Sequence, residues 1–209
     1  MTWRPFCTAV HLTSLGLWAG AVAISGATAA VAFPTLHDMK VRLPELPAAF
    51  EDDAYRFAAG AVAQRVFLIT DIASFVCATL AGVTLLVLFV KRGVDRARPI
   101  TYVRSLAYGV ALASLAATLF VVTPGIIAAS KNDLNAARVG DAAASAAARK
   151  ASADLHPIAK NLLMAEFLGA SVALFLGAFA SASGPLSPSP GAPEESEYPK
   201  PDLLKSKRG

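Results

Sequence analysis

Four long apolar runs constrain the fold of this chain more than any other feature of its sequence. They lie at 6–33, 66–90, 106–128 and 162–182, and none of them contains lysine or arginine. Each is close to or above the ~20 residues that a helix needs to cross a bilayer. Because lipid offers the backbone no hydrogen-bond partner, such runs are expected to form transmembrane helices. The sequence therefore predicts an all-α fold, a four-helix transmembrane bundle.

The composition supports this prediction and excludes other classes of protein. Of the 209 residues 55% are hydrophobic and 16% are charged, whereas a soluble domain carries about a quarter charged residues. The runs are continuous rather than alternating, which excludes an outer-membrane barrel, and two cysteines are too few for a disulfide scaffold. In a membrane protein, a net charge of +4 sets topology and attracts anionic lipid. The expected partners are therefore membrane lipid and other membrane proteins or further copies of this chain, and not nucleic acid.

A change in composition near residue 183 divides the chain. Residues 1–183 form the predicted four-helix membrane domain, and residues 184–209, rich in proline, serine and charge, are expected to be a disordered tail. The connection 91–104 carries five basic residues against the single acid Asp95, so it is expected to be cytoplasmic. With four spans, both termini then lie in the cytoplasm, and the chain is a multi-pass protein of the bacterial inner membrane. The first run exceeds the ~7–15 residues of a signal-peptide core, so it is expected to be retained.

The two connections on the opposite, periplasmic side contain helix formers and few breakers. Residues 47–66 hold no breaker beyond the first proline except Gly60, so the second helix is expected to begin outside the membrane. Residues 134–156 are rich in alanine, the best helix former. They either lengthen the fourth helix or form a separate surface helix. The predicted bundle therefore has helical extensions on one side.

Small residues recur four positions apart in three of the predicted helices. At this spacing they lie on one helix face and let neighbouring backbones approach closely inside a membrane. We interpret the following as helix-packing positions: Gly16, Gly20, Ala78, Gly82, Gly169, Ala173 and Gly177.

Two acidic residues, Asp71 and Glu166, lie within the apolar runs. Ionisable groups inside a membrane are costly and often mark ion or proton pathways. Each follows a basic residue, Arg65 or Lys160, by six positions, which places both carboxyl groups about 9 Å from the same membrane face. They are expected to share a proton, to receive a cation or to pair with these basic residues. The alternative is two hydrogen-bonded structural acids.

The histidines lie near the ends of the predicted helices. His37 and His156 fall on the periplasmic side with Met39 nearby, and two imidazoles and a thioether suit copper. The alternative is that both are interfacial histidines bonded to backbone or water. His11 lies at the other end of the first helix without a second histidine at its depth, which argues against bound haem. Trp18, in the middle of that helix, is interpreted as a packing residue. No catalytic motif is found, so no catalytic residue is assigned.

Five short strings suggest a family. HLTSLGLWAGAV, AFPTL, AAGAVAQRVF, VVTPGI and LHPIAKNLLMAEF cover roughly residues 8–180. They resemble a four-helix integral membrane domain of unknown function, whose eukaryotic relatives are transmembrane proteins associated with cisplatin resistance. The resemblance implies four helices, with one proline ending the first and another closing the third. The residues at the family's positions are His11, Trp18, Gly20, Pro34, Gly60, Phe67, Pro124 and His156.

More distantly, the start of the first helix is similar to that of copper resistance membrane proteins of the D type and of bacterial membrane protoporphyrinogen oxidases. Neither likeness is close enough to imply an activity. In the suspected family small and hydroxylic residues follow the last histidine, whereas Pro157 and Ala159 stand there in this chain. This departure argues against a ligand role for His156.

Three classes of function remain. The small size and the lack of a convergent polar set favour a non-enzymatic accessory or scaffolding subunit of a larger membrane assembly. The alternative is a periplasm-facing protein that handles a metal or small solute, in resistance or transport, as an oligomer. The third class is a haem- or porphyrin-binding membrane protein. No cofactor is predicted, with copper and haem kept as alternatives.

Overall fold

The computed structural model describes residues 3–91 and 98–182 of the chain. The predicted all-α class is confirmed, because this part of the chain contains helices and no strand. The expected tail at 184–209 lies outside the described residues, as do Arg92, Asp95 and Arg96 of the basic connection. The elements are α1 (Trp3–Asp38), the 3-10 helix η1 (Ala48–Asp53), α2 (Ala54–Val90), α3 (Pro99–Ala117), the π-helical turn η2 (Thr118–Val122), α4 (Thr123–Arg138) and α5 (Ala142–Ala182).

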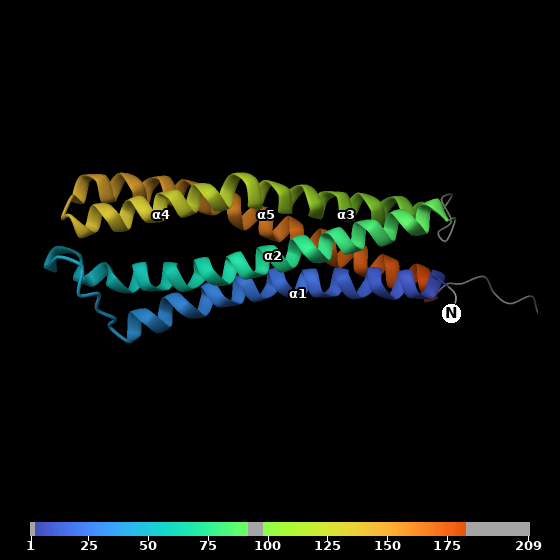
Figure 1. The fold of residues 1–209 in the computed structure, drawn as a ribbon, viewed down its shortest axis with the longest axis horizontal. Helices are drawn as coiled ribbons and strands as arrows, with labels where there is room; N and C mark the ends of the chain where they lie inside the picture. Colours follow the sequence, from blue (N-terminus) through green and yellow to red (C-terminus); the bar gives the residue numbers. More distant parts are fainter. Residues whose placement is uncertain (1–2, 92–97, 183–209) are drawn as a thin grey trace, which may run out of the picture.

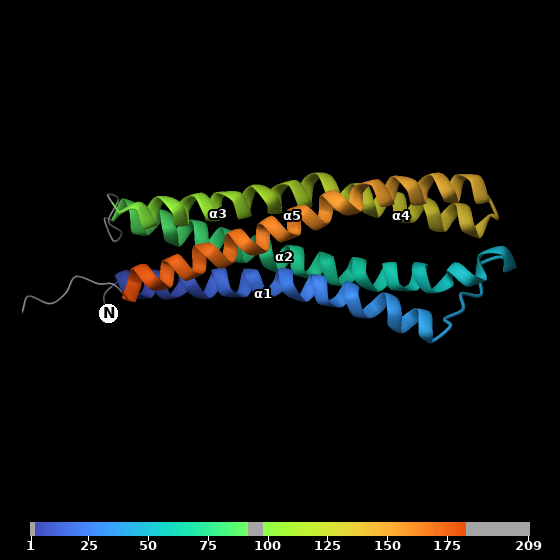
Figure 2. The same cartoon turned by 180° about the vertical axis from the view of Figure 1, so that it is seen from behind.

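The predicted four-helix bundle is also confirmed. Four helical spans are long and apolar enough to cross a membrane, and α3, η2 and α4 together make up the third of them. α1 packs along α2, and α5 packs along α4 and α3 before it reaches α1 (Figure 1). The start of α1, the end of α5, the end of α2 and the start of α3 lie at one end of the bundle (Figure 2). The η1 segment and the α4–α5 turn lie at the other end.

The helices are longer than a membrane requires. A helix of about 40 residues is about 60 Å long, whereas the hydrocarbon core of a bilayer is about 30 Å thick. We call the part of the bundle that contains the start of α1 and the apolar runs the membrane half. We call the other end, formed by η1, the start of α2, the end of α4 and the start of α5, the tip. The tip corresponds to the helical extensions expected from the sequence.

Two prolines do not end helices as the family resemblance implied. α1 continues through Pro34 to Asp38. At Pro124 the chain passes from the π-helical turn η2 into α4, and the third span runs on to Arg138 instead of ending at Ala128. A proline at the first positions of a helix lacks only an N–H that would be unpaired in any case. The π turn before Pro124 takes up the change in hydrogen bonding and lets the helical path continue.

From Ala142 onwards the alanine-rich segment belongs to the long helix α5 of the fourth span rather than to a separate surface helix, whereas residues 134–138 end α4. The turn before it is set by Gly140, whose φ of 77° is rarely adopted by other residues. The backbone N–H of Asp141 then donates to the carbonyl of Ala136, which closes the end of α4. The Asp141 carboxylate in turn accepts the backbone N–H of Ala144 at 2.9 Å and so caps the start of α5.

Small side chains dominate the core of the membrane half. Because alanine adds little bulk, the helix axes approach closely, and a few large residues fill the remaining space. The buried cluster consists of Leu15, Trp18, Ala19, Val22, Ala78, Ala81, Ala111, Leu115, Ala170 and Ala173.

Two of the predicted packing glycines lie so close to α3 that a Cβ atom there would force a neighbour in α3 to shift. A Cβ atom at Gly169 would stand 2.7 Å from the carbonyl oxygen of Ala107 and 3.0 Å from Cβ of Ala111, so α5 touches the backbone of α3. A Cβ atom at Gly82 would collide with the hydroxyl of Tyr108. These glycines therefore set the separation of helices from different parts of the chain.

The other predicted packing positions differ in their surroundings. Ala78 and Ala173 are buried in the core, and Gly177 faces side chains of α1 and α3. A Cβ atom at Gly16 would make an ordinary contact 3.9 Å from a leucine of α5. A Cβ atom at Gly20 would meet nothing within 4 Å. Gly20 is thus not required for packing within the single chain.

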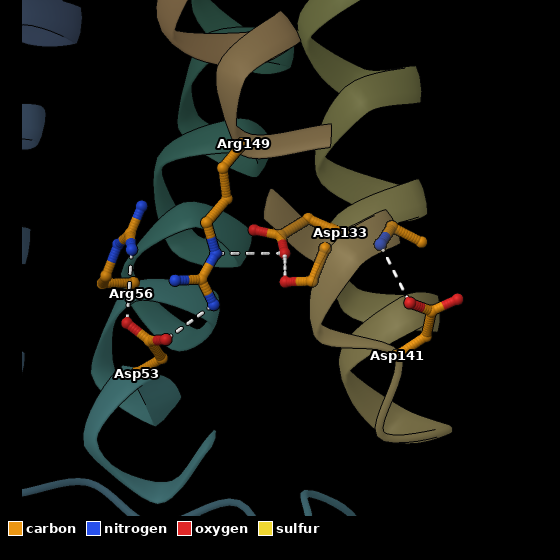
Figure 3. A network of polar contacts seen from close by, with 7 residues as sticks. Asp53, Arg56, Asp133, Asp141 and Arg149 are labelled. Atoms are coloured by element: carbon orange, nitrogen blue, oxygen red, sulfur yellow. Dashed lines mark hydrogen bonds and ion pairs between the residues drawn. The ribbon is translucent and has the colours of Figure 1, made fainter. Parts of the chain in front are cut away.

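The tip has a small apolar core and a network of charges. Arg149 of α5 forms ion pairs with Asp53 of η1 at 2.6 Å and with Asp133 of α4 at 3.3 Å (Figure 3). Arg56 pairs with Asp53 at 3.2 Å, and the Ser145 hydroxyl donates to Asp133. We call these five residues the tip network. The apolar core beside it comprises Leu46, Phe50, Ala54 and Ala137.

Candidate intramembrane polar site

The membrane half contains a buried group of polar side chains around the two acids. Glu166 of α5 is 1% exposed and Asp71 of α2 is 8% exposed. The indole Nε1 of Trp18 donates to Oε1 of Glu166 at 2.6 Å. The hydroxyl of Thr123 donates a longer hydrogen bond, 3.4 Å, to Oδ2 of Asp71. We call these four residues, contributed by α1, α2, α4 and α5, the acidic layer.

The two carboxyl groups of the acidic layer are close enough to interact electrostatically. The sequence left pairing with Arg65 or Lys160 open, but both of these side chains are exposed. Within residues 3–91 and 98–182, no basic side chain forms an ion pair or hydrogen bond with Asp71 or Glu166. Neither acid therefore has a positive partner from this part of the chain.

A second pair of hydroxyl groups extends the acidic layer towards the tip. Ser25 of α1 and Thr70 of α2 are hydrogen-bonded to each other at 2.5 Å, and Thr70 is next to Asp71 in the chain. Each hydroxyl can also donate to a carbonyl of its own helix, Ser25 to Ala21 and Thr70 to Val66. This part of the interface between α1 and α2 is polar although it lies in apolar sequence.

Sequence reasoning missed the role of Trp18. The side chain is completely buried, as expected of a packing residue, and its ring meets Tyr108 edge to face with centroids 6.0 Å apart. A buried indole N–H usually finds a hydrogen-bond acceptor, and the acidic residues of the apolar runs were the available acceptors. That rule could have suggested a carboxylate partner, but the sequence could not show that Glu166 rather than Asp71 lies opposite Trp18.

A basic pair lies nearer the end of the bundle that holds the start of α1. His11 of α1 is 1% exposed, and its Nδ1 donates to the carbonyl of Ala81 in α2 at 2.9 Å. Arg104 of α3 is 6% exposed and interacts electrostatically with His11. The sequence assigned Arg104 to a cytoplasmic connection, but α3 already begins at Pro99, so Arg104 lies in its second turn and faces the interior. We call His11 and Arg104 the basic layer.

The residues proposed as copper ligands lie at the surface. His37 is exposed, contacts Asp38 at 3.3 Å and meets the ring of Tyr55 edge to face. His156 donates from Nδ1 to the carbonyl of Ser152 in its own helix at 2.7 Å, and the side chain of Met39 is exposed. His37 and His156 thus contact different residues and do not contact each other in these interactions. Among the described residues there is no group of three or more His, Cys, Asp or Glu that could hold a metal ion.

No protein-family model, no curated protein and no solved structure matches this chain. The family resemblance therefore stays a prediction, and the chemistry must be argued from the geometry alone. That geometry offers an acidic layer of carboxyl and hydroxyl oxygens and, about 10 Å away along α1 from Trp18 to His11, a separate basic layer.

Proposed function

We propose that this chain is a non-enzymatic integral membrane protein that takes up a proton or a small cation at the acidic layer. The observation that carries the proposal is the burial of Asp71 and Glu166, close enough to interact electrostatically and with no described basic partner. Two uncompensated negative charges in a membrane interior are very costly. A shared proton or a bound cation removes this cost, and its release from one side is the basis of solute handling.

The ligand atoms favour a proton or a hard cation over copper. The acidic layer and its extension offer carboxylate oxygens of Asp71 and Glu166 and hydroxyl oxygens of Thr123, Ser25 and Thr70. Oxygen ligands suit protons and hard cations, whereas copper prefers imidazole and sulfur. Four spans offer little room for a transport path in one chain, so the active form would be an oligomer.

The orientation of the protein belongs to the same proposal. We place the start of α1 and the end of α5 in the cytoplasm of a bacterial cell and the tip on the periplasmic side. Lys91 and Arg98 flank the α2–α3 connection at the end where α1 starts, and basic connections of this kind stay in the cytoplasm. The acidic layer would then be loaded from the periplasmic side, towards which its hydroxyl extension points.

The test is proton uptake by the purified protein in lipid vesicles with an internal pH-sensitive dye. Glu166→Gln keeps an acceptor oxygen for Trp18 but cannot ionise, and Asp71→Asn does the same at the second acid. Both variants are expected to lower the proton flux driven by a membrane potential to about a tenth or less of the wild-type value. Glu51→Gln, at an exposed acid of the tip, is the matched control and keeps the flux.

Infrared difference spectra between acidic and alkaline buffer sharpen this test. The wild type is expected to show the carbonyl band of a buried protonated carboxyl group, and Glu166→Gln is expected to lose part of it. A folded wild-type protein without flux under a proton, sodium or potassium gradient, and without this band, would overturn the proposal.

A second candidate function is the accessory or scaffolding subunit favoured by the sequence. The observation in its favour is Gly20, a small residue on α1 with open space around its Cβ position, which another membrane helix could fill. The mass of the particle purified from its own membranes in mild detergent distinguishes the two. Partner proteins in fixed ratio support the subunit, and a homo-oligomer or single chain contradicts it.

A further inference from the structure

The basic layer lies where three helices converge, at a depth close to one membrane surface. Arg104 is five residues into α3, about 8 Å from the start of that helix. A Cβ atom at Gly177 of α5 would stand 3.6 Å from Cδ and Nη1 of Arg104 and 2.8 Å from Cδ2 of Leu12. The guanidinium therefore lies between α1, α3 and α5 instead of extending outwards to water.

Three buried nitrogen atoms of the basic layer have no hydrogen-bond partner among the described residues: Nε and Nη2 of Arg104, and Nε2 of His11. Because Nδ1 of His11 faces a carbonyl oxygen, which can only accept, Nδ1 carries a proton and Nε2 is the free position. Nε and Nη2 of an arginine form one edge of the guanidinium, with two parallel N–H groups. This edge fits two oxygens of one phosphate or carboxylate group.

No negative charge from the described residues balances the positive charge of Arg104 or of a protonated His11. His11 interacts electrostatically with Arg104, whose positive charge has the same sign as that of a protonated imidazole. In the part of the chain that the structure describes, neither residue has an acidic partner. A buried guanidinium without a counter-charge and with unpaired N–H groups is strongly unfavourable. An anion that bridges Arg104 and His11 would supply both the charge and the missing acceptors.

We propose that the basic layer binds a phosphate group, with the free edge of Arg104 on two of its oxygens. The bound anion favours protonation of His11, whose Nε2 then donates to a third oxygen. Basic pockets between transmembrane helices on the cytoplasmic side bind the head groups of anionic lipids, and the depth of Arg104 suits such a head group. Free inorganic phosphate has the same chemistry and is the second source. The inference does not depend on the acidic layer or on proton uptake there.

The experiment uses native mass spectrometry of the full-length protein in detergent, with phosphatidylglycerol, phosphatidylcholine or inorganic phosphate added. The wild type is expected to bind one phosphatidylglycerol in preference to phosphatidylcholine. Arg104→Gln is expected to weaken this binding about tenfold, because it removes charge-assisted hydrogen bonds. Arg104→Lys keeps the charge but not the paired edge, and should fall in between. Lys91→Gln, an exposed basic residue at the same end, is the matched control and should bind as the wild type does.

The source of the phosphate is decided by competition. Displacement of the lipid by millimolar inorganic phosphate, or phosphate binding without lipid, assigns the site to the free ion. Retention of the lipid assigns it to the head group. If Arg104→Gln does not fold, the wild type alone still gives an answer, because a bound ligand raises its melting temperature. Phosphatidylglycerol or inorganic phosphate should raise it, and phosphatidylcholine should not.

Three results would overturn the proposal. The first is equal binding of phosphatidylglycerol by the wild type and Arg104→Gln. The second is no binding or stabilisation by either source of phosphate. The third concerns Asp95, the single acid of the connection before α3: no lipid or phosphate binding by the wild type, with binding only in Asp95→Asn, would show that this acid, and not a phosphate, neutralises Arg104.

Discussion

The two ends of this molecule place their buried or partly buried charges in opposite ways. At the tip, acids and bases alternate: Arg149 lies between Asp53 and Asp133, so each carboxylate has a basic partner. In the membrane half, acids and bases are sorted into two layers, with Glu166 in one and Arg104 in the other. The comparison indicates that the tip network serves the fold. The two layers of the membrane half have no described counter-charge, and they are the places at which we propose that ligands bind.

The tip also shows how neighbouring charges fix an ionisation state. Partial burial by itself would lower the pKa of Arg149, but the hydrogen bond and charge of Asp53 and those of Asp133 outweigh burial and raise the pKa above its usual value. Arg149 therefore stays charged at any pH at which the chain is folded. Among the described residues, no oppositely charged side chain pairs with the acids of the acidic layer or with the basic groups of the basic layer.

The largest effect is expected where helix backbones touch in the membrane half. Gly169→Ala forces a methyl group against the backbone of Ala107 and should destabilise the bundle by about 2–3 kcal/mol. Gly20→Ala, the matched change in open space, should leave stability within about 0.5 kcal/mol. Thermal unfolding in detergent measures both. Equal melting temperatures for the two variants would contradict the close approach of α3 and α5.

A smaller loss is expected at the centre of the tip network. Arg149→Met leaves Asp133 without a basic partner and Asp53 with only Arg56, which should cost about 2 kcal/mol, since the group is only partly buried. Proteolysis of the tip should become faster, while proton flux at the acidic layer stays at the wild-type level. If flux fell as much as in Glu166→Gln, the two ends would be coupled and the comparison would fail.

The same chemical change at both ends should give different results. Asp133→Asn removes a charge that has a partner and should destabilise the protein by about 1 kcal/mol. Glu166→Gln removes a charge that has none and keeps an acceptor for Trp18, so stability should change by less than about 0.5 kcal/mol or increase. Melting temperatures of the pair in one detergent decide this. A strong destabilisation by Glu166→Gln would assign Glu166 a structural role.

The smallest effect is expected at the outer edge of the tip network. Arg56 pairs with Asp53 across one helical turn with much of its side chain in water, so Arg56→Gln should cost about 0.3 kcal/mol. High salt should reduce this difference further because it screens exposed charges. A loss as large as that of Arg149→Met would show that the two arginines act as one unit.

The sequence predicted the gross architecture because it depends on local properties. Apolar runs without Lys or Arg predict helices in lipid, and alanine-rich flanks predict their continuation beyond it. The expected ends at Pro34 and Pro124 were wrong, since whether a proline ends a helix depends on how the freed carbonyl is satisfied. The sequence analysis placed Arg104 in a connection, whereas α3 already includes it. A charged residue beside a basic loop looks the same in sequence whether it belongs to the loop or to the first turns of the next helix.

Sequence alone thus determined that the chain forms four long apolar helices, that these suit a membrane, and that Asp71 and Glu166 are the acids within the apolar runs. Only the tertiary structure decided which side chains meet. The partner of Glu166 is Trp18, 148 positions earlier in the chain, and His11 is held by a carbonyl of α2. Helical periodicity fixes the face on which a residue lies, but not which neighbour that face contacts. That depends on the rotation and crossing of whole helices, which close contacts such as that of Gly169 with α3 set.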